Sequence, residues 1–88
     1  MSERLVNVRL YDPETGTDWT GALPASTQIE ALTDLLYEKK LKAFQPIGYG
    51  YIAEGHLCNN RFVLADYMPE DANSIELRIF AYPQVLQG

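Results

Sequence analysis

The chain has 88 residues, of which 47% are hydrophobic and 22% are charged, and its formal net charge is −5. This length allows a single domain, and the acidic balance argues against nucleic acid and anionic membranes as partners, because both are bound by basic surfaces. No apolar run approaches the roughly 20 residues of a membrane span, the start lacks the apolar core of a signal peptide, and the lone cysteine cannot form an internal disulfide. We therefore expect a cytoplasmic protein with protein partners.

The first quarter of the chain predicts a β-hairpin. Apolar and polar residues alternate through 5–11, and this period of two is typical of a half-buried strand. A turn signal follows at 12–16, where Asp, Pro and Gly stand close together. The run 17–23 then pairs back as the second strand, and Gly21 within it is expected to mark a bulge.

A helix is predicted over about 28–40. Thr27 and Glu30 have the spacing of a capping box, in which each side chain satisfies a free backbone amide at the helix start. Apolar residues then recur at helical spacing and form one stripe. The lysines of the chain gather near the predicted end of this helix, where positive charge opposes the helix dipole: Lys39, Lys40 and Lys42.

The second half of the chain predicts strands. Short strands are expected at 49–53 and 61–64, and a final strand at 74–79 alternates as clearly as the first one. This order of elements predicts an α+β domain in which one helix packs across a mixed sheet of four or five strands. Residues 1–80 form the expected domain, and 81–88 form an expected flexible C-terminal tail.

One segment of the second half resembles ubiquitin. The run 55–67 begins with Gly, passes through a polar turn and ends with Leu-Ala-Asp-Tyr, where ubiquitin has Leu-Ser-Asp-Tyr. The run 29–32, Ile-Glu-Ala-Leu, is similar to the Ile-Glu-x-Val opening of the ubiquitin helix. The resemblance covers about 5–80 and implies the ubiquitin-like β-grasp fold. It also implies that Tyr67 closes a loop through its hydroxyl.

The resemblance implies a function without an active site. Ubiquitin-like modifiers are joined to target proteins through a C-terminal glycine, which makes Gly88 the expected conjugation residue. The implied partners are an activating and a conjugating enzyme and a processing protease, and the implied class is a bacterial ubiquitin-like modifier. The alternative is a non-conjugated ubiquitin-like adaptor, similar to the β-grasp accessory proteins of type VII secretion systems, that binds proteins non-covalently.

A second implied feature is a docking surface on the exposed face of the sheet. Ile52 retains one member of the apolar patch of ubiquitin, whereas Glu76 and Arg78 replace two others. With Phe80 and Tyr82, these are the predicted partner-binding residues. The more economical interpretation of Glu76 and Arg78 is a solvated strand face with a cross-strand charge pair. Both interpretations, partner binding and a solvated face, stay open.

Residues for catalysis or metal binding are not expected. His56 and Cys58 lie close in sequence, but zinc requires three or four ligands, and nucleophilic catalysis requires a base and an orienting group in a cleft. We expect His56 in a loop and Cys58 in the core beneath a turn, because a free cysteine behaves as a small apolar residue. No cofactor is implied.

Overall fold

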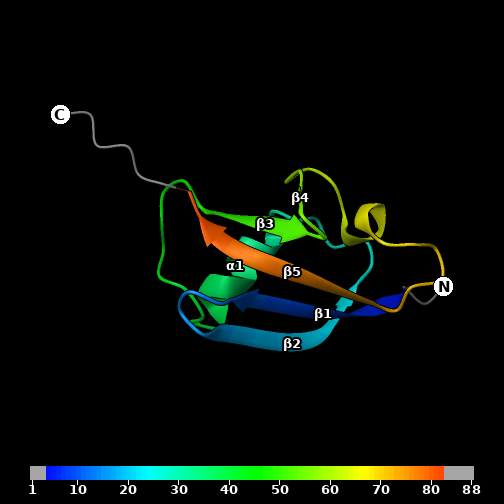
Figure 1. Cartoon of the computed structure of the whole chain (residues 1–88), viewed down its shortest axis with the longest axis horizontal. Coiled ribbons are helices and arrows are strands. Elements are labelled where there is room, and N and C mark those ends of the chain that lie inside the picture. Colours follow the sequence, from blue (N-terminus) through cyan, green and yellow to red (C-terminus); the bar gives the residue numbers. More distant parts are fainter. Residues whose placement is uncertain (1–3, 83–88) are drawn as a thin grey trace.

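The computed structural model describes residues 4–82, which form five strands, one α-helix and one 3₁₀-helix (Figure 1). In chain order the elements are β1 (Leu5–Asp12), β2 (Thr17–Pro24), α1 (Ala31–Glu38), β3 (Tyr49–Ala53), β4 (His56–Leu57), η1 (Leu64–Tyr67) and β5 (Ser74–Ala81). Most of the predicted tail, including Gly88, lies outside the described residues.

The strands form one mixed sheet in the order β2-β1-β5-β3-β4. Strands β1 and β5 are parallel at its centre, and the other neighbouring pairs are antiparallel. Helix α1 crosses one face of this sheet and leaves the other face open (Figure 1). The predicted fold class, a mixed sheet with one helix packed across it, is confirmed.

The core fills the space between α1 and the sheet. The alternating residues of β1 and β5 are buried as predicted, and they meet the apolar stripe of α1. Tyr51 also packs inward, fully buried, with its hydroxyl 2.9 Å from that of Thr33 on α1. The largest fully buried aliphatic side chains are Val6, Val8, Leu10, Ile29, Leu32, Leu36, Leu64, Leu77 and Ile79.

The β1–β2 hairpin has an unbroken register, so the bulge predicted at Gly21 is wrong. A Cβ atom at Gly21 would lie 2.5 Å from two ring atoms of Trp19. Glycine is needed there because the indole lies across the strand, two residues along on the same face. Gly16 has a φ of 77°, as its place in the predicted turn requires.

Helix α1 begins at Ala31, three residues later than predicted, and ends at Glu38. Its start has no side-chain cap, so the capping box predicted from Thr27 and Glu30 is wrong. The amides of Ile29 and Glu30 instead donate to carbonyls of the 60–62 loop, at 2.9 and 3.1 Å. Tertiary hydrogen bonds therefore satisfy groups that a local cap would otherwise serve.

The strand predicted at 61–64 is also wrong. Within it, Val63 forms only an isolated bridge with Gln28, and the chain then enters η1. The amide of Val63 donates to the Asp66 carboxylate at 2.9 Å, which fixes a helical turn in place of an extended strand. The second short strand is β4, which pairs with β3 through a tight turn at Glu54 and Gly55, both with positive φ.

The loop before η1 is closed by Tyr67. The backbone amide of Asn59 donates to the Tyr67 hydroxyl at 2.5 Å, which is the role that the resemblance implied. Cys58, next to this turn, is 4% exposed and belongs to the core, as predicted. His56 is exposed on β4 rather than in a loop.

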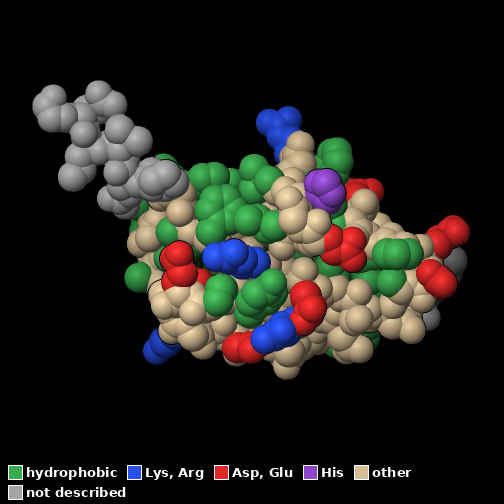
Figure 2. Space-filling view, viewed as in Figure 1, with side chains coloured by type: hydrophobic (Ala, Val, Ile, Leu, Met, Phe, Trp, Pro, Cys, Tyr) green, Lys and Arg blue, Asp and Glu red, His purple; other side chains and the backbone are tan. Residues whose placement is uncertain are grey.

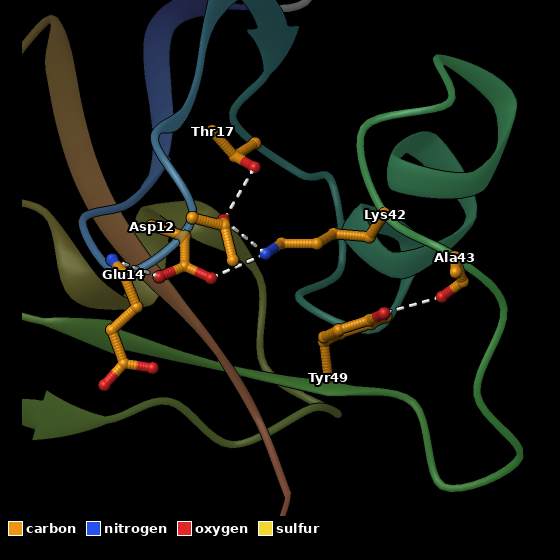
Figure 3. A network of polar contacts seen from close by, with 7 residues as sticks. Asp12, Glu14, Thr17, Lys42, Ala43 and Tyr49 are labelled. Carbon is orange, nitrogen blue, oxygen red and sulfur yellow. Dashed lines mark hydrogen bonds and ion pairs between the residues drawn. The ribbon is translucent and has the colours of Figure 1, made fainter.

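Lys42 lies beyond the end of α1 and does not serve the helix dipole as predicted. Its Nζ atom lies 2.6 Å from Oδ2 of Asp12 at the end of β1 and 2.9 Å from the Thr15 hydroxyl (Figure 3). The two charged side chains are only 12% and 10% exposed. This pair joins the β1–β2 turn to the segment that follows α1.

Candidate partner-binding surface

The open face of the sheet carries a cluster of apolar side chains, of which Leu57 is exposed and the others are partly buried. Strand register places Ile52 opposite Leu57 on β4 and opposite Arg78 on β5, so all three point to this face. Phe80 points the same way two residues further along β5. We call this cluster the sheet-face patch, and it consists of Ile52, Leu57, Arg78, Phe80 and Tyr82. Figure 2 shows apolar side chains gathered on this face with a basic side chain beside them.

The aromatic end of the patch depends on a glycine. Gly50 on β3 pairs with Phe80, and a Cβ atom at Gly50 would overlap the Phe80 ring. The ring therefore lies over the backbone of β3. Tyr82 meets it edge to face, with 5.0 Å between ring centroids. These two rings form the aromatic end of the patch, beside the end of β5.

Arg78 is the charged member of the patch. It is exposed, and among the described residues no carboxylate lies within ion-pair distance of it. Its strand neighbours are Ile52 on β3 and Tyr11 on β1. A cation beside apolar side chains and without a partner is well placed to receive a carboxylate from another protein.

Glu76 does not join this patch. It lies nearer β1, where Arg9 binds it at 2.7 Å and binds Asp18 of β2 at 2.8 Å. The hydrogen bond from Arg9 lowers the pKa of Asp18 below its usual value. The expected cross-strand charge pair is thus present, but Arg9 rather than Arg78 is the partner of Glu76.

The structure brings together Ile52, Arg78, Phe80 and Tyr82 from the predicted set and adds a residue that the sequence did not reveal. Leu57 is 58% exposed at the edge of the patch. A strand of two residues shows no alternation, so its sequence carries no signal for which way Leu57 points. Gly88 lies outside the described residues.

The described residues offer little for other chemistry. No group of three or more potential metal ligands occurs within 4–82. Burial raises the pKa of the Cys58 thiol, which disfavours the reactive thiolate. In the same range, no helix has the length and hydrophobicity needed to cross a bilayer.

Comparison with known proteins identifies the fold through structure. No family model and no curated protein matches the sequence. A ubiquitin-fold protein from Arabidopsis thaliana is similar with a TM-score of 0.65 and 16% identity, over 99% of this chain and 97% of that one. The ubiquitin-like domain of another Arabidopsis thaliana protein gives a TM-score of 0.65 and 14% identity, over 88% of this chain and 77% of that one.

A designed protein based on ubiquitin gives a TM-score of 0.66 and 19% identity, over 90% of each chain. Identities this low establish the shared fold and leave function open. Together with the mixed five-stranded sheet and its single helix, these likenesses show that the chain has the ubiquitin-like β-grasp fold.

Proposed function

We propose that this chain is a ubiquitin-like protein that acts by being bound, with the sheet-face patch as its docking surface. The observation that carries the proposal is an unpaired, exposed Arg78 beside the exposed Leu57 and the partly buried rings of Phe80 and Tyr82. Arginine and aromatic residues dominate the binding energy of protein interfaces. All members of the patch except Tyr82 also lie on strands, which hold their side chains in fixed positions.

The partner chemistry follows from the patch. The partner places a carboxylate against Arg78 and an apolar side chain against Leu57 or the Phe80 ring. A protein that recognises ubiquitin itself is expected to bind poorly, because Arg78 puts a charge on the face where the resemblance implies an apolar residue in ubiquitin. We further propose a cytoplasmic setting, with which the buried thiol of Cys58 is compatible.

The test compares two charge reversals that change the net charge equally. Arg78→Glu lies in the patch, whereas Arg61→Glu lies in the exposed turn after β4 and outside it. Each variant is immobilised beside the wild type, and captured proteins are quantified by mass spectrometry. We expect specific partners to be lost at least about tenfold with Arg78→Glu and retained with Arg61→Glu. Equal retention by both variants removes the patch as the docking surface.

We propose conjugation through Gly88 as a second function. It is favoured by the resemblance at 55–67. An activating enzyme would join the Gly88 carboxylate to AMP from ATP and release pyrophosphate. Its thiol would then displace AMP, a conjugating enzyme would accept the thioester, and a target amine would displace the thiol to leave an amide.

Conjugation is tested by incubating the protein with ATP, a candidate activating enzyme and host lysate. Mass spectrometry then searches for an ester or amide at Gly88. We expect adducts that disappear when Gln87 and Gly88 are deleted, with an unchanged melting temperature. Absence of adducts with a cognate enzyme present leaves the non-covalent adaptor, the alternative that uses the sheet-face patch alone.

A further inference from the structure

A groove of about 500 Å³ lies on the helix side of the molecule, between α1 and the 44–48 segment that leads into β3. One wall is apolar. Phe44 is 74% exposed and Ile47 is 53% exposed, and these two are among the most exposed large apolar residues of the described chain. When a partner covers such side chains, the free energy of the complex falls because apolar surface is removed from water.

This apolar wall is held in position rather than left loose. The ring of Tyr37 on α1 packs against Phe44 with 5.3 Å between centroids. The Tyr37 hydroxyl donates to the carbonyl of Gln45 at 3.2 Å. The groove is therefore formed before any partner arrives, which lowers the entropic cost of binding.

The opposite wall is acidic. Glu30 and Asp34 line the groove four residues apart, where side chains of a helical turn lie on the same face. Both are exposed, and among the described residues neither has an ion pair. No lysine or arginine lines the groove, and the net charge of −5 adds to its negative potential.

The groove also contains an unused acceptor. The side-chain oxygen of Gln45 is buried and has no hydrogen-bond partner within the described part of the chain. A buried acceptor without a donor is costly.

We propose that this groove docks a protein segment in which a basic side chain stands next to an apolar one. The basic group binds Glu30 and Asp34, and the apolar group covers Phe44 and Ile47. The site lies on the α1 side of the sheet, whereas the sheet-face patch lies on the opposite face. The proposal does not depend on conjugation or on Arg78.

The probe is an acetylated, amidated peptide in which arginine alternates with leucine, added to the ¹⁵N-labelled protein. Its twin carries glutamate in place of each arginine. We expect amide shifts of α1 and 44–48 to move with the first peptide and not with the second. Asp34→Lys should weaken binding roughly five- to tenfold, as loss of a charge contact at an interface does.

Glu38→Lys is the matched control, because it changes the charge equally on the same helix at an exposed position that does not line the groove. Arg78→Glu is the second control and should leave the affinity undiminished. Equal weakening by Asp34→Lys and Glu38→Lys would show that the peptide affinity responds only to net charge. That result would overturn the assignment of the groove as a docking site. Absence of binding, or shifts confined to the sheet-face patch, would also overturn it. Failure of the sheet-face proposal would appear only in the Arg78→Glu capture experiment.

Discussion

At the scale of single residues, the pair between Asp12 and Lys42 joins two parts of the fold that are distant in sequence (Figure 3). Burial disfavours the charged carboxylate and by itself raises the pKa of Asp12. The hydrogen bond from Lys42, the amide of Glu14 and the lysine charge outweigh that effect, so the pKa of Asp12 is lowered. Each charge is therefore tolerated because the other is present.

Replacing Lys42 with methionine should destabilise the protein. The change keeps an apolar stem of similar length but leaves the buried Asp12 without its cation, which costs roughly 3 kcal/mol. Chemical denaturation at neutral pH measures the difference. Lys39→Met is the control, because Lys39 is exposed and should change the free energy of unfolding by less than about 0.5 kcal/mol. Equal effects of the two substitutions would show that the pair is not stabilising.

The same pair predicts a pH dependence of stability. Because the pKa of Asp12 is lower in the folded than in the unfolded chain, its stabilising contribution is complete above the unfolded value of about 3.9. The contribution is lost as the pH falls through the folded pKa. Asp12→Asn should therefore be less stable than wild type at pH 7, and the difference should shrink below about pH 4. A difference that stays constant across this window would contradict the assignment.

At the scale of elements, the approach of β3 to β5 shapes the sheet-face patch. Gly50 leaves the space into which the Phe80 ring settles. Gly50→Ala should displace that ring and cost about 1–3 kcal/mol, as overpacking typically does. The measurement is thermal unfolding, with the double variant that also carries Phe80→Ala as its control. Removing the ring should make the Gly50 substitution nearly neutral, and an undiminished cost would mean that the ring does not cause the strain.

The elements also show which structural features local sequence can reveal. Strands β1 and β5 were predictable because one buried face and one solvated face impose a period of two. The start of α1 and the segment 61–64 were not, since their amides bond across the fold: those of Ile29 and Glu30 donate to the 60–62 loop, and that of Leu64 donates to the Thr27 carbonyl. Such partners are known only after the chain has folded.

The candidate surface was predictable to a similar degree. Ile52, Arg78 and Phe80 follow from alternation on two strands once the sheet is known. The pairing of Glu76 with Arg9 depends on the parallel register of β1 with β5, which no local pattern specifies. The groove beside α1 depends on how a loop folds back on a helix, so Phe44 and Ile47 gave no signal.

At the scale of the whole molecule, the β-grasp architecture presents two surfaces of opposite character. The open face of the sheet offers an unpaired cation among aromatic side chains, and the helix side offers unpaired carboxylates beside exposed apolar ones. The proposed role is that this small fold, held together by one core, contacts other proteins through these two surfaces. Conjugation through Gly88 would add a covalent link to the same surfaces.

The most direct test of the docking claim is NMR mapping of the wild-type protein with a partner that the Arg78→Glu variant fails to capture. Amide and methyl signals of the labelled protein are followed as unlabelled partner is added. We expect the largest changes on Ile52, Leu57 and Phe80, with small changes on α1. Changes confined to α1 and the 44–48 segment would contradict the assignment of the sheet-face patch as the docking surface.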